Sequence, residues 1–160
     1  MILLCFDGSD DAREAADRTA ALFPGMPVTV LTVWEPYLET LASTGFGLGF
    51  EPPLADVRGI DAETGERARR TAEDGATRVR RSGSPVEART EQRDGSVYAT
   101  VLTVADELGA DAIVLGTRGH GGVASLLLGS VSHAVVQHAD RPVVIVPAPA
   151  IARARRTRGA

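Results

Sequence analysis

The sequence predicts an α/β protein in which a parallel sheet is covered by helices on both faces. Short apolar runs, typical of strands buried on both sides, alternate with segments whose apolar residues recur at helical spacing. Strands and helices that alternate in this way form parallel sheets through right-handed crossovers. With 160 residues, the chain has the length of one domain. We therefore expect a single-domain, doubly wound, five-stranded parallel sheet.

Four apolar runs and one weaker segment, residues 85–90, provide the expected strands. The apolar runs are rich in Val, Ile and Leu, and most are bounded by Gly, Pro or Asp residues. The five expected strands span residues 2–6, 28–33, 85–90, 112–115 and 143–146. The last run is entered through Pro142 and left through Pro147, which limits its length.

Helical spacing between these runs predicts the covering helices. Ser9 or Asp10 is the expected cap of the first helix, and Ser96 is the expected cap of the third. The second helix is expected over residues 61–81. Residues 35–59, which precede it, are rich in Pro and Gly and long for a loop, so we expect either a lid over a site or a mobile segment.

The charge pattern excludes several chemistries. All 17 basic residues are arginines, so the chain offers no P-loop lysine and no Schiff-base lysine. The formal net charge is −4, although four of the arginines lie in the last eight residues. The acidic remainder argues against nucleic acid as a partner. We expect one domain over residues 1–148 and a basic, disordered tail over 149–160.

The N-terminal and apolar segments predict a cytoplasmic protein. No apolar run approaches the roughly 20 residues that a membrane helix needs, and the first residues lack the pattern of a signal peptide. The single Cys5 lies inside an expected strand and is interpreted as a buried, inert thiol.

One stretch, residues 111–132, carries the chemistry. An apolar strand ends at Gly116, a glycine-rich loop follows, and an expected helix over residues 131–138 begins with Ser130 or Ser132 as its cap. Glycines let a ligand approach the backbone, and the first N–H groups of a helix attract anions. This combination predicts a phosphate site.

The spacing within this stretch is specific. Gly116, Gly119, Gly129 and Ser130 form the pattern G-x2-G-x9-G-S. At these four positions the chain resembles the ATP-binding branch of the universal stress protein family, and the resemblance extends over residues 2–147. It implies a Rossmann-like sheet of strand order 3-2-1-4-5, in which the first and fourth strands meet at the ligand site.

The resemblance also implies roles for individual residues. Asp7 would accept hydrogen bonds from the nucleoside, and Phe6 and Val33 match positions around the adenine. Arg118 would grip phosphate oxygens, since a guanidinium can do so without the missing lysine. Each residue also has a structural alternative. Asp7 would only form a turn, Phe6 and Val33 would only pack at their strand ends, and Arg118 would only be exposed to solvent.

The phosphates would lie along the glycine loop and the start of the following helix. The residues expected to bind them are Leu115, Gly116, Gly119, Gly129, Ser130, Val131 and Ser132. The expected ligand is ATP, with AMP and ADP as alternatives, and Mg²⁺ can accompany the triphosphate although no ligand set for a metal is readable.

No catalytic group stands out in the sequence, so we expect a nucleotide-responsive regulator. A slow ATPase or phosphotransferase on the same fold is one alternative, and an interaction module with a vestigial site is another. The strand at residues 143–146 would lie at the sheet edge without any charge, bulge or internal proline. We therefore expect a homodimer through this strand, as the resemblance also implies.

Overall fold

The computed structural model describes residues 1–37, 40, 54–117, 119 and 128–148. Its core is one sheet of five parallel strands in the order β3-β2-β1-β4-β5. The strands are β1 (Ile2–Cys5), β2 (Val28–Trp34), β3 (Val86–Gln92), β4 (Ala112–Gly116) and β5 (Val143–Val146). The expected fold class and strand order are confirmed.

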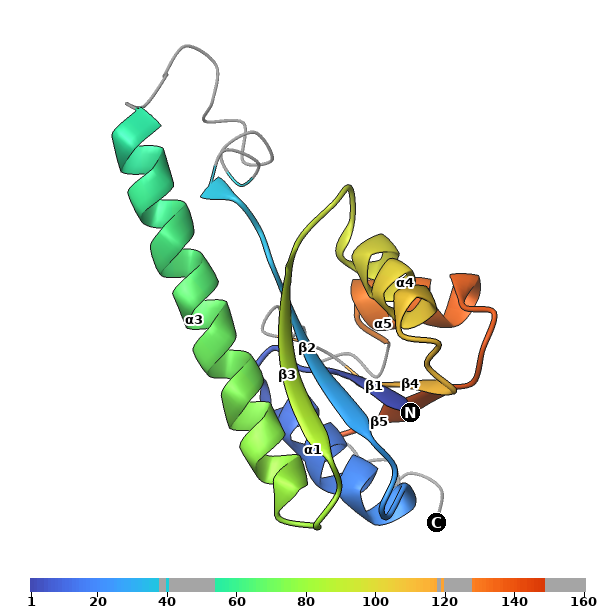
Figure 1. Ribbon diagram of the computed structural model, residues 1–160. Coiled ribbons are helices and arrows are strands. Elements are labelled where there is room, and N and C mark those ends of the chain that lie inside the picture. Colours follow the sequence, from blue (N-terminus) through green and yellow to red (C-terminus); the bar gives the residue numbers. More distant parts are fainter. Residues whose placement is uncertain (38–39, 41–53, 118, 120–127, 149–160) are drawn as a thin grey trace.

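In the described part of the chain, four helices connect the strands and cover both faces of the sheet (Figure 1). They are α1 (Asp10–Leu22), α3 (Leu54–Arg80), α4 (Val97–Glu107) and α5 (Ser130–His138). Alanines of α1 pack with Ala76 and Val79 of α3 against one face of the sheet. Val101 and Val104 of α4 pack with Val135 of α5 against the other face. The result is three layers with the sheet in the middle.

The long helix α3 departs from the sequence expectation at its start. It begins at Leu54 rather than at residue 61, so residues 54–59 of the expected irregular segment are helical. In Figure 1, its first turns extend past the end of β2. Further along α3, a Cβ on Gly75 would lie 2.8 Å from Cγ of Phe6. The helix can therefore approach the sheet closely only because this position has no side chain.

Several expectations lie outside the described residues. These are the basic tail at 149–160, most of the irregular segment before α3, and the centre of the glycine-rich loop. Among the helices that the structure describes, none is long and apolar enough to cross a membrane.

Candidate functional site

The carboxyl ends of β1 and β4 meet at the position where the strand order changes direction. Asp7 follows β1 and is exposed, and its Oδ1 accepts a hydrogen bond from the Ser9 N–H at 2.9 Å. A Cβ on Gly119 would collide with Oδ2 of the same carboxylate. The structure therefore brings Asp7 and the glycine loop together, at the place where α/β sheets bind their ligands.

Gly116 is required by packing inside the protein. It ends β4 and is buried, and a Cβ there would lie 2.7 Å from the Asp11 backbone carbonyl carbon in the first turn of α1. Backbone cannot yield as a flexible side chain can, so β4 approaches α1 this closely only with glycine at this position. Gly116 thus has an explanation that involves no ligand, whereas Gly119 lies only against the exposed side chain of Asp7.

Hydrogen bonds close the base of the glycine loop. The Gly129 N–H donates to the Thr117 carbonyl oxygen at 2.8 Å, and the Ser132 hydroxyl donates to the Gly116 carbonyl oxygen at 2.9 Å. The Thr117 N–H and hydroxyl both donate to the Val146 carbonyl oxygen, at 3.0 and 3.2 Å. Thr117 was not among the residues expected at the site, because its partner is 29 residues away. The ends of the loop are therefore held together, and they are also held to β5.

Helix α5 begins differently from the expectation. Its N-cap is Gly129, with φ −64° and ψ 161°, and this residue has no side chain that could accept a hydrogen bond from the first turn. The proposed caps Ser130 and Ser132 were wrong: Ser130 is already the first helical residue, and the Ser132 hydroxyl is donated to Gly116. The N-cap residue therefore supplies no side-chain acceptor to the N–H groups of the first turn of α5, and these groups can donate hydrogen bonds to an anion.

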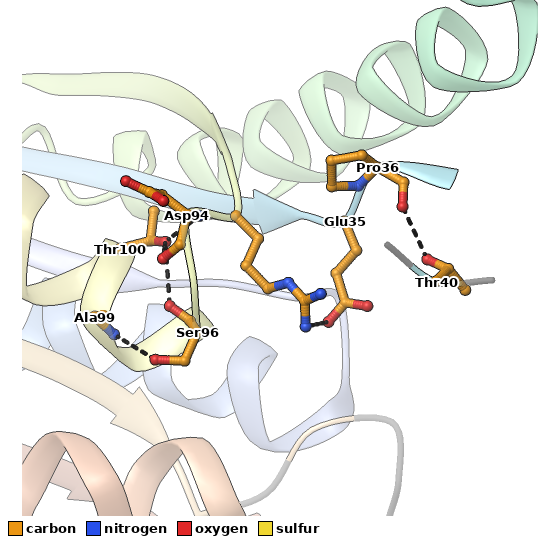
Figure 2. A network of polar contacts seen from close by, with 8 residues as sticks. Glu35, Pro36, Thr40, Asp94, Ser96, Ala99 and Thr100 are labelled. Atoms are coloured by element: carbon orange, nitrogen blue, oxygen red, sulfur yellow. Dashed lines mark hydrogen bonds and ion pairs between the residues drawn. The ribbon is translucent and has the colours of Figure 1, made fainter. Parts of the chain in front are cut away.

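The two neighbouring helices at this edge are capped by their own side chains. Ser9 Oγ accepts from the Ala12 N–H at 3.2 Å at the start of α1, as expected. Ser96 Oγ accepts from the Ala99 N–H at 3.3 Å at the start of α4, and the Thr100 hydroxyl donates to the Ser96 carbonyl oxygen (Figure 2). Both starts thus contrast with that of α5.

The turn between β3 and α4 is also tied to the end of β2. Arg93 follows β3, and its guanidinium lies 3.1 Å from Oε1 of Glu35, the residue after β2. This ion pair is partly exposed, so it contributes little to stability by itself. It nevertheless places opposite charges on two loops at the carboxyl ends of β2 and β3 (Figure 2).

The remaining expected site residues occupy strand ends and the helix start. The Phe6 ring is buried against α3, its N–H donates to the Leu31 carbonyl oxygen, and its own carbonyl oxygen accepts from the Thr32 hydroxyl. Leu115 is buried, while Val33 and Val131 are partly buried beside the core on the α4 and α5 face. Arg118 lies outside the described residues.

Two observations concern other reactive groups. Burial in the first place, and the nearby Asp7 carboxylate in the second, together raise the pKa of the Cys5 thiol to about 12, so the thiol is protonated at neutral pH. Within the described part of the chain, no group of three or more His, Cys, Asp or Glu side chains is placed to hold a metal ion.

Comparisons with known proteins match nearly the whole chain. The family model described as "Universal stress protein family" matches residues 1–147. A universal stress protein of Thermus aquaticus is 34% identical over 147 residues, which cover 91% of this chain and 96% of the relative. A second relative, from Bacillus subtilis, is 30% identical over 148 residues, with 91% of this chain and 97% of the relative covered.

Solved structures of similar fold include proteins with bound nucleotides. A universal stress protein from Archaeoglobus fulgidus in complex with dAMP has a TM-score of 0.59 and 24% identity, covering 91% of this chain and 95% of that one. A universal stress protein in complex with cAMP has a TM-score of 0.61 and 22% identity, with coverages of 92% and 95%. A family protein from Arabidopsis thaliana with AMP bound has a TM-score of 0.61 and 17% identity, with coverages of 93% and 92%. These structures show the shared fold, while the family model and the two relatives of 34% and 30% identity establish that the chain belongs to the universal stress protein family.

Proposed function

We propose that this protein binds an adenine nucleotide, ATP in the first place, where β1 and β4 meet, and acts as a nucleotide-responsive regulator in the cytoplasm. The observation that carries the proposal is the start of α5. Gly129 leaves the first turn without a side-chain cap, at the end of a loop whose base is closed by hydrogen bonds. This arrangement presents backbone donors and the positive end of the helix dipole to a phosphate.

Nucleotides bound to other proteins of this fold support the same class of ligand. At 24% identity or less, those structures are evidence of fold alone, so the assignment to this chain depends on its own residues. The complete G-x2-G-x9-G-S pattern resembles that of the ATP-binding branch of the family, and this resemblance supports ATP as the ligand. Gly116 is explained by packing, whereas a glycine N-cap at position 129 is what a bound phosphate would require.

In this proposal the ligand lies across the ends of β1, β2 and β4. The N–H groups of Ser130, Val131 and Ser132 would face the phosphates, and Arg118 would add a guanidinium. Asp7 would accept from the nucleoside through its exposed carboxylate, beside the bond that it already makes to Ser9. AMP and ADP fit the nucleoside contacts equally, and Mg²⁺ would enter with the triphosphate.

Mass spectrometry of the purified protein after denaturation tests the proposal. We expect an adenine nucleotide to be released from the wild type. Gly129→Val places a branched side chain beside the phosphate path and should remove that nucleotide. Gly59→Val is the matched control, because Gly59 lies on α3 with no heavy atom within 4 Å of an added Cβ. Wild-type protein that neither carries a nucleotide nor binds added ATP contradicts the proposal.

We also propose that the protein forms a homodimer through β5. The two edges of the sheet differ: β3 carries Glu87, Arg89 and Glu91, whereas β5 is the uncharged sequence VVIV. Charges on an edge strand discourage pairing with another chain, and β5 has none. Antiparallel pairing of two copies of β5 would make an isologous two-fold interface.

The hydrogen bonds of β5 show which residues face a second copy. Ile113 N–H donates to the Pro142 carbonyl oxygen, and Thr117 N–H donates to that of Val146, so even-numbered residues face β4. By alternation, the backbone groups of Val143 and Ile145 face outward. Ile145→Pro removes an outward N–H and leaves the bonds to β4 in place.

Analytical ultracentrifugation checks the dimer. We expect a wild-type dimer at micromolar concentration and a monomer for Ile145→Pro. Val144→Lys, which adds a charge to the edge strand, should also weaken the dimer, whereas the exposed change Val136→Lys on α5 should leave it unchanged. A wild-type monomer, or a dimer that neither β5 variant affects, would be contrary to this proposal.

A further inference from the structure

Thr117 contacts both the start of α5 and the end of the edge strand. Its carbonyl oxygen accepts the Gly129 N–H at 2.8 Å, and its own N–H donates to the Val146 carbonyl oxygen at 3.0 Å. Its hydroxyl makes a second bond to the same Val146 oxygen at 3.2 Å. Thr117 is 1% exposed and Val146 is 6% exposed, so water does not compete for these bonds. One buried residue therefore joins the proposed phosphate site to β5.

We propose that Thr117 couples the nucleotide site to the β5 edge, so that ATP binding and pairing of a second copy strengthen each other. This inference rests on the proposed function and on the proposed dimer. ATP would hold Gly129 and the base of the loop, and a second copy would hold Ile145, the residue before Val146. Whichever binds first further restrains the fluctuations of the Thr117–Val146 contact, and the entropy cost of restraining them is then lower for the other. Linkage requires that the coupling be reciprocal.

Of the bonds between Thr117 and Val146, the one from the Thr117 hydroxyl can be removed by a substitution without disturbing the backbone bond. Thr117→Val keeps the shape of the side chain and the backbone bond to Val146. The Val146 carbonyl oxygen therefore retains one donor and is not left unsatisfied, so the variant should fold. Thr117→Ser keeps the hydroxyl and should retain the coupling. Thr19→Val is the matched control, because Thr19 is fully buried in α1 and its hydroxyl donates to the Ala15 carbonyl oxygen at 2.7 Å.

The experiment measures the dimer dissociation constant of the full chain with and without saturating ATP. We expect ATP to tighten the wild-type, Thr117→Ser and Thr19→Val dimers by roughly fivefold or more. The Thr117→Val dimer should show a clearly smaller ATP effect while still binding ATP, because the hydroxyl bond is lost and only the backbone bond to Val146 remains. As a measurement independent of the variants, ATP should slow hydrogen exchange of the Thr117 and Ile145 amides in the wild type.

The outcomes separate the inference from the proposed function. Wild-type protein that does not bind ATP, or that stays monomeric, overturns the function or dimer proposal and the inference with it. Wild-type protein that binds ATP and dimerises with equal affinity in both conditions overturns the inference alone. Persistence of the full ATP effect in Thr117→Val, or unchanged exchange of the two amides, overturns the inference as well.

Discussion

Helices α1 and α5 begin at the same edge of the sheet, yet their first turns are completed in different ways. At the start of α1, Ser9 Oγ accepts a backbone N–H, and Asp7 Oδ1 accepts that of Ser9. At the start of α5, Gly129 has no side chain, and the Ser132 hydroxyl is donated to Gly116. The comparison teaches that a helix start beside a ligand edge is not by itself an anion site. The start of α5 can serve as one because its N-cap residue, Gly129, has no side chain with which to cap it.

The largest effect on stability is expected where the end of β4 contacts the first turn of α1. Gly116→Ala would place a Cβ 2.7 Å from the Asp11 backbone in the first turn of α1. We expect a loss of about 1–3 kcal/mol in the free energy of unfolding, since overpacking against backbone cannot be relieved locally. Chemical denaturation measures it. Gly59→Ala, at an open helical position, is the control and should be neutral or stabilising. A fully stable Gly116→Ala variant would show that the contact is looser than described.

The next largest expected effect is a loss of nucleotide affinity, which should differ between a variant at the nucleoside end of the site and one at the phosphate end. Asp7→Ala should weaken ATP and AMP alike, by about tenfold, because a charged hydrogen-bond acceptor is lost. Arg118→Ala should weaken ATP more than AMP, because a guanidinium attracts the added phosphates. Isothermal titration of both ligands measures the two ratios. Equal losses for both ligands in the two variants would remove this division of roles.

A smaller effect is expected at the cap of α1. Ser9→Ala removes the acceptor for the Ala12 N–H and should lower the free energy of unfolding by about 1 kcal/mol. The ATP-induced rise in Tm should stay as in the wild type, because the cap serves α1 alone. Thermal melts with and without ATP check both statements. If Ser9→Ala abolished the ATP effect, the start of α1 would have to be part of the ligand site.

Most of the fold was readable from local sequence patterns. Four of the five strands are apolar runs bounded by turn residues, and β5 begins and ends where residues 143–146 predict. The expected Ser9 and Ser96 caps are also observed, because an N-cap acts within its own first turn. The strand order required the family resemblance, since local periodicity does not state which strands are neighbours.

The errors occur where a distant partner decides the local structure. Ser132 has the sequence context of a cap, yet its hydroxyl donates to Gly116, 16 residues away. Helix α3 begins before residue 61, although Gly59 is a poor helix former by propensity. Thr117 carries no motif at all, and only the fold brings it to Val146. Local rules therefore predicted the elements and the glycine spacing, but not the bonds that close the loop.

The central claim is that phosphate binds at the first turn of α5, and Gly129→Asp tests it most directly. A carboxylate at the N-cap accepts the first-turn N–H groups and repels phosphate, which makes α5 resemble α1. In wild-type protein, ATP at a hundred times its Kd should stabilise the fold by about 2.7 kcal/mol and raise Tm by roughly 5–10 °C. We expect Gly129→Asp to melt at or above the wild-type Tm without ATP and to show no ATP-induced rise, while Gly59→Asp keeps the rise. A full ATP-induced rise in Gly129→Asp would contradict the account.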